Sequence, residues 1–276
     1  MNEIVKYDNY MNGLRFTGFT ATDFNFLMLL CSKLRDKDTS KITISFAEIR
    51  EKTEYTQRPV KQFVSDLQRM NDKLMKITCK LQTETEIIMF VLFPTFRIDL
   101  ENQMLTVAVN EDFKFILNEL IKNFTRFDLN EFVRLNSKYS KNLYRLLKQY
   151  RITGQYEVSL EEFRSKMDVP EAYTGKRIMD NVINPALKEL KESNYFKNLE
   201  CIVQYAHKKG RPVVGYVFTF DQEERVYSRE IEQKNQKSDS KPKKNRDKIK
   251  NSRFNNIECR GYDYEALEKQ LLNKRD

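Results

Sequence analysis

Residues 137–154 read SKYSKNLYRLLKQYRITG, and this stretch has the pattern of one amphipathic helix. Ser137 is a typical N-cap residue, and Gly154 is suited to closing the helix. Between them, apolar residues recur three and four positions apart, which places them on one helical face. That face consists of Tyr139, Leu143, Leu146, Leu147 and Tyr150. The stretch therefore predicts a helix that packs one side against a protein core.

The residues that follow this helix complete a known order of elements. Residues 156–158 alternate as a short strand, 160–167 predict a short helix that stops near Pro170, and Thr174 can cap a second long helix. Two strands on either side of a turn come last, at 199–205 and 213–220. Helix, strand, helix, helix and hairpin is the order of a winged helix, in which a β-wing follows a helix-turn-helix.

Pro185 lies well inside the helix that begins after Thr174. It lacks a backbone N–H, and its ring crowds the carbonyl of Asn181, four residues earlier. We therefore expect a kink in this helix.

The same order occurs in the first half of the chain, after an arm over residues 1–20 that we expect to be irregular. Thr20 or Thr22 can cap a first helix, and Thr56 can cap a long helix with Pro59 in its first turn. Between these helices the pattern predicts a strand and a short helix, at 42–45 and 46–52. Three further strands are predicted, at 77–81, 87–98 and 104–109.

Two copies of this order predict the α+β class, with two tandem winged-helix domains in 276 residues. We expect an N-terminal domain over 1–123, with DNA contact and self-association, and a C-terminal domain over 124–232, with the main DNA binding. Residues 233–276 are expected to form a disordered basic linker and a short C-terminal helix. That helix has an apolar stripe and needs a partner surface to be stable; the stripe is Tyr264, Leu267, Leu271 and Leu272.

Basic charge is concentrated in the linker. The net charge of the chain is +9, but residues 234–253 hold nine Lys or Arg against two Asp, which is +7 and leaves +2 for the rest. DNA binding therefore has to be argued from local faces rather than from the total charge. The four cysteines are scattered without a CxxC pair, and neither a secretory signal nor a membrane span is visible, so we expect a cytoplasmic setting.

The composition argues against enzyme chemistry. His207 is the single histidine, so the His-hydrophobe-His metal pair of rolling-circle nickases cannot form, and His207 lies in a basic turn without an orienting acid nearby in sequence. The sequence Gly175-Lys176-Arg177 lacks the first glycine and the hydroxyl residue of a Walker A loop. We therefore expect no catalytic residues, no metal and no cofactor.

Each predicted helix-turn-helix presents a polar face on its second helix, which is the helix that enters the major groove. On the helix after Thr56, we expect DNA contacts from Arg58, Lys61, Gln62 and Arg69. On the helix after Thr174, we expect them from Lys176, Arg177, Asn181, Asn184 and Lys188. Arginine can pair with guanine, and asparagine or glutamine with adenine, through two hydrogen bonds each. An ordinary solvated face is the alternative for each helix.

The two predicted wings differ in charge. The second turns through a cationic tip suited to phosphate, which contains Lys208, Lys209 and Arg211. The first is expected to turn through 82–86, where two glutamates would repel phosphate. The apolar run 87–93 is either a strand buried on both faces in its own domain or a strand that pairs with a second copy. We expect the second domain to dominate DNA binding and the first to mediate a homodimer.

Three segments of the second half resemble a known family: SKYSKNLYRLLKQYRITG (137–154), INPALKEL (183–190) and GRPVVGYVFTF (210–220). They are similar to the RepB-like initiator proteins of theta-replicating plasmids that contain iterons. The resemblance implies tandem winged helices, binding to directly repeated origin DNA, and recruitment of host replication proteins such as a helicase, loader or initiator. It also implies dimers that repress their own promoter and monomers that bind the origin. The segment 254–272 is similar to endings of other bacterial replication-associated proteins.

A plasmid replication initiator is thus the function that the sequence favours. A transcriptional repressor with the same two domains is the first alternative, and replication of a marker plasmid from the adjacent repeats would separate the two. A primosome scaffold that does not read sequence is the second alternative. A binding assay with duplexes that contain or lack the native repeats would discriminate it.

Overall fold

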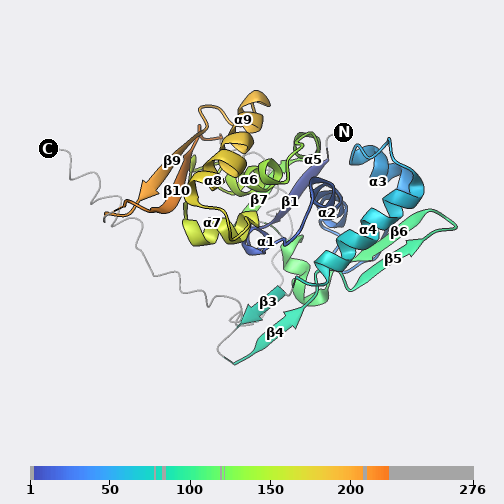
Figure 1. The fold of residues 1–276 in the computed structure, drawn as a ribbon. Helices are drawn as coiled ribbons and strands as arrows, with labels where there is room; N and C mark the ends of the chain where they lie inside the picture. Colours follow the sequence, from blue (N-terminus) through green and yellow to red (C-terminus); the bar gives the residue numbers. More distant parts are fainter. Residues whose placement is uncertain are drawn as a thin grey trace, which may run out of the picture. The chain divides into compact units, whose positions relative to one another are not determined.

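The computed structural model describes residues 3–77, 79–82, 85–118, 120, 122–207 and 210–223. Residues 1–80 and 88–225 form one compact unit, which contains both winged helices. Its helices and strands have the order expected of the α+β class (Figure 1). The predicted linker and C-terminal helix at 233–276 lie outside the described residues, as do Lys208 and Lys209.

The first winged helix follows the predicted order. Thr20 caps the first helix in a capping box with Asp23, as its sequence indicates. Strand β2 forms one edge of an antiparallel sheet, which runs β2-β6-β5. The elements are α2 (Ala21–Leu34), β2 (Ile42–Ser45), α3 (Phe46–Lys52), α4 (Val60–Leu74), β5 (Thr95–Asp99) and β6 (Met104–Ala108).

The position predicted for the first wing is wrong. Strands β3 (Cys79–Gln82) and β4 (Ile87–Phe90) form a separate two-stranded sheet, and the hairpin that pairs with β2 is β5–β6. The predicted strand over 87–98 is interrupted between β4 and β5, where Leu92 and Phe93 are buried and Pro94 follows. Proline cannot donate to a strand ladder, so the predicted strand is divided between two sheets, with β4 in one and β5 in the other.

The N-terminal arm is regular rather than irregular, which corrects the prediction for residues 1–20. It contains strand β1 (Ile4–Asp8) and the short helix α1 (Tyr10–Gly13). Strand β1 pairs antiparallel with β7 (Phe124–Asp128), which leads into helix α5 (Leu129–Val133). Because the partner strand lies more than a hundred residues away, no local pattern indicated it. The pairing joins residues on either side of the predicted boundary at 123/124.

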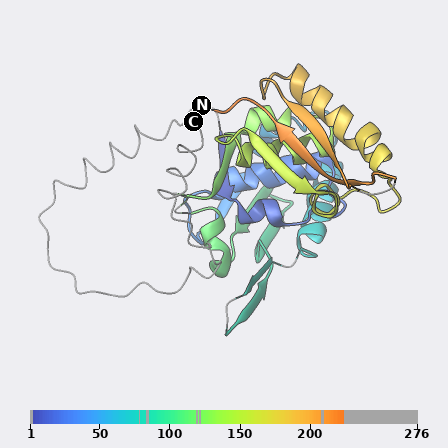
Figure 2. The same cartoon turned by 90° about the vertical axis from the view of Figure 1, so that its left-hand side faces the viewer.

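The second winged helix also follows the predicted order, and its sheet runs β8-β10-β9 in the same sense as the first. Ser137 caps α6 as predicted, and Gly154 has a left-handed φ of +67° just before β8. In Figure 2 the orange strands and the gold helix of this half lie side by side. The elements are α6 (Lys138–Gln149), β8 (Gln155–Ser159), α7 (Leu160–Met167), α8 (Gly175–Ile178), α9 (Asn184–Glu192), β9 (Glu200–Tyr205) and β10 (Val213–Thr219).

The helix that contains Pro185 is irregular just before the proline, where the sequence predicts a kink. Between α8 and α9 the backbone forms a π-helical turn, η2 (Met179–Ile183), and Pro185 occupies the start of α9. A π-turn takes up one extra residue in the helical ladder. This local change accommodates the proline and the carbonyls in front of it without ending the helix.

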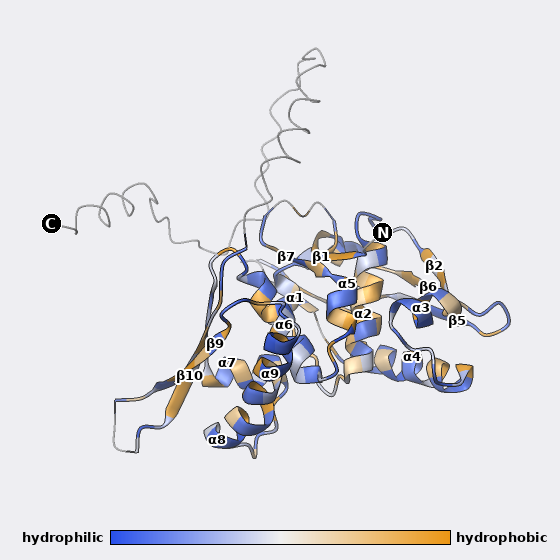
Figure 3. Cartoon of the chain, turned by 90° about the horizontal axis from the view of Figure 1, so that it is seen from above, coloured by the Kyte–Doolittle hydropathy of each residue, from blue (hydrophilic) through white to orange (hydrophobic). Residues whose placement is uncertain are grey.

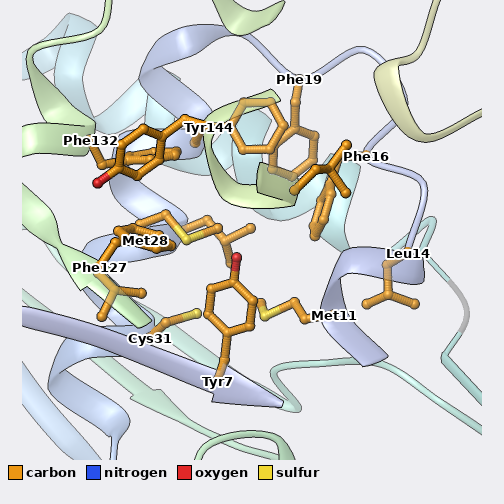
Figure 4. Close-up of a cluster of buried hydrophobic side chains, with 14 of the residues drawn as sticks. Tyr7, Met11, Leu14, Phe16, Phe19, Met28, Cys31, Phe127, Phe132 and Tyr144 are labelled. Atoms are coloured by element: carbon orange, nitrogen blue, oxygen red, sulfur yellow. The ribbon is translucent and has the colours of Figure 1, made fainter. Parts of the chain in front are cut away.

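One continuous core joins the two winged helices and the arm. Figure 4 shows Tyr7, Met11 and Phe16 of the arm directed toward side chains of α2, β7, α5 and α6. The ring of Phe127 on β7 packs against those of Tyr7 and Tyr144, with centroids 6.0 and 5.3 Å apart. The arm is therefore an internal layer of the fold rather than a peripheral tail.

Lys141 on α6 is fully buried beside the end of α5. Its Nζ donates to the carbonyl oxygens of Phe132 and Val133, at 2.6 and 3.0 Å. Burial lowers the pKa of Lys141 to about 7, although the charges of Glu189 and Glu54 oppose the shift. Burial therefore favours the deprotonated form of Lys141 in the folded protein, and the neutral amine can still donate both hydrogen bonds.

We expect stability to depend on pH through Lys141. Between about pH 7 and its ordinary value of 10.5, the unfolded chain binds this proton and the folded chain does not. The wild type should therefore gain stability relative to Lys141→Met as pH rises through this range, by at most about 1.4 kcal/mol per pH unit. Urea unfolding of both proteins at pH 6, 7, 8 and 9 measures the difference, in which the titration of cysteines and tyrosines cancels. Parallel stability curves would contradict the prediction.

Candidate nucleic-acid interface

Arg50 of α3 holds the turn before helix α4 through hydrogen bonds to backbone carbonyls. The guanidinium donates to the carbonyl oxygens of Tyr55, Thr56 and Arg58, at 3.2, 3.1 and 2.7 Å. Thr56 does not cap the helix, contrary to the prediction, because α4 begins at Val60 and Pro59 occupies the N-cap position without a side-chain bond. Since the turn is already fastened through its carbonyls, the start of α4 is positioned by α3 rather than by its own cap.

Three of the four residues predicted to contact DNA lie on the exposed face of α4, whereas Arg58 lies in the turn before the helix rather than on it. The side chains of Arg58, Lys61, Gln62 and Arg69 are exposed, opposite the buried Phe63, Leu67 and Met70. Three of the four converge on one carboxylate that the sequence reasoning did not single out. Asp66 is 1% exposed and contacts Arg58, Gln62 and Arg69.

The second helix-turn-helix is fastened in the same way. Arg164 of α7 donates to the carbonyl oxygens of Pro170 and Tyr173, on the turn before α8. Arg50 and Arg164 end two similar segments, SFAEIR (45–50) and SLEEFR (159–164), in which Ser45 and Ser159 cap their helices. This internal repeat is the signal by which the sequence could have identified both arginines. A guanidinium suits the task because it offers several donors in one plane.

On the face formed by α8, η2 and α9, the predicted residues are exposed and make few contacts with other side chains of the described residues. Thr174 caps the helix by accepting from the backbone N–H of Arg177 at 3.3 Å. The five predicted side chains are exposed, and among the described residues only Lys188 has an ion-pair partner, Glu192 at 3.8 Å. Figure 3 shows hydrophilic and hydrophobic segments along both α4 and α9. The predicted residues of this face are Lys176, Arg177, Asn181, Asn184 and Lys188.

The tips of the two wings differ in charge, although the first lies elsewhere than predicted. The β5–β6 tip carries Asp99 and Glu101, and Asp99 accepts from the backbone N–H of Asn102 at 2.9 Å. At the β9–β10 tip, Arg211 is exposed and its guanidinium lies 5.3 Å from the ring of Tyr205. Lys208 and Lys209 belong to this turn but lie outside the described residues.

Comparison with protein families places both halves of the chain. A family model described as "Initiator Replication protein, WH1" matches residues 4–148, and one described as "Initiator Rep protein, WH2" matches residues 159–220. The chain belongs to the initiator replication protein family. Its two winged helices are thus the two domains that define this family, as the resemblance in the sequence implied.

Two similar proteins extend the comparison. A probable replication protein rep from Bifidobacterium longum (strain NCC 2705) is 36% identical over 224 residues, which is 80% of this chain and 74% of the relative. The crystal structure of Pi initiator protein in complex with iteron DNA has a TM-score of 0.61 at 14% identity. The match covers 81% of this chain and 98% of the Pi initiator chain, so the two proteins share the tandem fold.

The described residues hold no cluster of three His, Cys, Asp or Glu side chains arranged to bind a metal ion. A membrane-spanning helix would need a longer apolar run than any helix in the described part of the chain provides. The exposed polar side chains on the faces of α4 and α8–α9, with Arg211 of the second wing, form the candidate site.

Proposed function

We propose that this chain is a plasmid replication initiator that binds repeated origin DNA through its two winged helices. The observation that supports this most is the duplicated geometry: in each half, an arginine of the first short helix fastens the turn before an exposed polar helix. Exposed guanidinium and amide groups on such a helix are the groups that read base edges in the major groove. Binding energy, rather than bond chemistry, would then direct host replication proteins to the origin.

Two measurements test this function. Labelled duplexes with and without the native repeats, compared at one stated salt concentration, should differ in affinity by several orders of magnitude. A marker plasmid that carries the gene and its adjacent repeats should replicate in a suitable host. Equal binding to both duplexes would contradict origin recognition, whereas repeat binding without plasmid replication would favour a transcriptional repressor.

The second winged helix is proposed to supply most of the sequence readout. Its candidate side chains are free of ion pairs within the described residues, apart from Lys188, whereas three of the four in the first half converge on Asp66. Its wing tip is basic, whereas the tip of the first wing carries two acids. Free donors near a basic tip allow the second winged helix to combine base contacts with phosphate contacts.

We expect Arg177→Ala to weaken binding to the repeats more than binding to random duplex. Arg177 lies in the first turn of α8, exposed, and without a side-chain partner among the described residues. Loss of a bidentate base contact costs about 1–3 kcal/mol, which is roughly 5- to 150-fold in affinity. Lys188→Ala, which removes a charge farther along the same face, is the comparison variant. An equal loss on both duplexes would make Arg177 a phosphate contact.

Strand β4 is proposed to mediate the homodimer. Ile87 and Met89 are 59% and 64% exposed, so the alternative of a strand buried on both faces does not hold for them. In contrast, Leu92 and Phe93 are buried and are not available to a second copy. Exposed apolar residues on a two-stranded sheet favour pairing with an identical strand.

Replacement of Ile87 and Met89 by glutamate should weaken self-association by at least about tenfold, because two apolar contacts are lost and four like charges meet across a twofold interface. Sedimentation velocity over a concentration series measures the change. Leu100→Glu is the matched control, since Leu100 is also 66% exposed but lies at the tip of the first wing. If Leu100→Glu dissociates the dimer and the β4 variant does not, the wing rather than β4 is the interface.

A further inference from the structure

The carboxylate of Asp66 lies beneath the exposed face of α4. Its Oδ2 accepts from the hydroxyl of Tyr55 at 2.5 Å, and its Oδ1 accepts from Nε2 of Gln62 at 2.9 Å. Arg69 contacts the same Oδ1, and Nη1 of Arg58 lies 3.5 Å from Oδ2. The two arginines remain 59% and 52% exposed, whereas Asp66 is 1% exposed. One buried acid therefore anchors three exposed side chains.

Arg58 is fastened on two further sides. Its guanidinium lies 5.4 Å from the centre of the Tyr55 ring, in cation–π geometry. Its carbonyl oxygen accepts from Arg50 at 2.7 Å. The backbone and the side chain of this residue are therefore both positioned before any DNA arrives.

Among the described residues, the second half of the chain has no such anchor. Asn181 lies six residues after the first residue of α8, as Asp66 lies six residues after the first residue of α4. Asn181 is exposed and has no side-chain partner among the described residues. The same helical position thus holds a buried acid in one half and a free amide in the other.

We propose that Asp66 is the specificity-determining residue of the first winged helix, where it holds Arg58, Gln62 and Arg69 in one arrangement and withholds two positive charges from phosphate. The inference rests on the proposed function, since it assigns a role within DNA recognition. With Asp66 in place, α4 reads bases from a fixed set of side chains without adding general affinity for duplex.

The free energies of these contacts favour base reading by α4 over general affinity for duplex. To reach phosphate, Arg58 or Arg69 must leave a buried carboxylate, which is costly to leave unpaired. A side chain that is already fixed loses less conformational freedom on contacting a base, so its contact discriminates more sharply. Burial by itself would raise the pKa of Asp66, but the hydrogen bonds from Tyr55 and Gln62 and the charges of Arg69 and Arg58 lower it below its usual value. Asp66 therefore stays ionised and keeps its contacts with Arg58 and Arg69.

Asp66→Asn in the full chain tests the proposal, because it removes the charge and keeps the shape. Affinity for random duplex should rise, with the slope of log affinity against log salt steeper by about one to two units, one for each arginine released to phosphate. The ratio of repeat affinity to random affinity should fall about tenfold. An unchanged slope and an unchanged ratio would overturn the proposal.

Asp72→Asn is the matched control. Asp72 is exposed on the same helix. Its replacement by asparagine changes the net charge by the same amount as Asp66→Asn but leaves the contacts of Asp66 intact. If both variants steepen the slope equally, net charge alone explains the effect and the proposal fails. If the wild type does not prefer the repeats at all, the proposed function fails instead.

Arg69→Gln provides a second route if Asp66→Asn does not fold, which thermal unfolding followed by circular dichroism would show. With Asp66 intact, Arg69 is expected to be held away from phosphate. Its loss should therefore lower the repeat-to-random ratio and leave the salt slope on random duplex unchanged. A slope reduced by about one unit would place Arg69 on phosphate already and overturn the proposal.

Discussion

Replacement of Arg145 by alanine is expected to destabilise the fold by about 3–5 kcal/mol, the largest effect of any single substitution considered. Arg145 is fully buried on α6. Its Nε donates to Asn142 at 2.6 Å, and its Nη1 donates to Oδ1 of Asn12 and the carbonyl of Met11, at 2.8 and 3.2 Å. Alanine leaves Oδ1 of Asn142 without its donor and opens a cavity among the rings of the arm. Oδ1 of Asn12 loses one of its two donors and keeps the hydroxyl of Tyr7, at 3.1 Å.

The loss of stability in Arg145→Ala should be largest at the N-terminal arm. The guanidinium lies 4.9 Å from the ring centre of Phe16, and Asn12 also donates to Thr125 and Gln149, at 2.8 and 2.9 Å. Arg145 therefore ties α1 to α6 and, through Asn12, to β7. Limited proteolysis of Arg145→Ala should cut within residues 9–20 before the rest of the unit opens.

Two further variants separate the causes. Arg145→Met restores most of the volume without the donors, so its loss measures the hydrogen bonds, and the remainder of the alanine loss measures the cavity. Arg134→Ala, at an exposed position near the end of α5, should stay within about 0.5 kcal/mol of the wild type. Urea unfolding gives all three values, and an Arg145→Ala protein as stable as Arg134→Ala would refute the role of the network.

Joint replacement of Lys208, Lys209 and Arg211 by alanine should lower the affinity for every duplex. If each side chain contacts one phosphate, the slope of log affinity against log salt decreases by about three units, and affinity near 0.15 M salt falls by roughly two orders of magnitude. The tip is suited to this contact because Arg211 is exposed beside Tyr205, and Gly210 turns the backbone with a φ of +83°. Repeat and random duplexes should be affected alike, unlike with Arg177→Ala.

A charge-matched control is needed, since removal of three cations weakens DNA binding at long range. Lys37, Lys41 and Lys122 are exposed residues outside both candidate helices and both wings. Their joint replacement by alanine should change the slope by less than one unit. If the two triple variants behave alike, the tip makes no direct phosphate contact.

Elements with a strong local signal were predicted well. The capping residues Thr20 and Ser137 lie where the sequence indicated, and the strand and short helix at 42–45 and 46–52 have the predicted bounds. Caps and amphipathic stripes depend on contacts between residues three or four positions apart, so they can be recognised without the rest of the fold. The exposed positions of the candidate DNA contacts followed from the same periodicity.

The incorrect predictions share a different cause. The arm was expected to be irregular because the partner of β1 is β7, and the first wing was misplaced because only the sheet decides which of four strands pairs with β2. The internal repeat SFAEIR and SLEEFR lay in the sequence, but the carbonyls that its arginines bind were visible only in the turns.

By itself, the amino-acid sequence determined that this protein has two winged helices in tandem, where the second helix of each helix-turn-helix lies, and the family to which the chain belongs. Only the tertiary structure decided that the arm is a strand of the core, that Arg145 is a buried tie, and that Asp66 holds the polar face of α4. The physical reason is range: helical periodicity and capping act within a few residues, whereas strand pairing, burial and ion pairing depend on which distant residues the chain brings together.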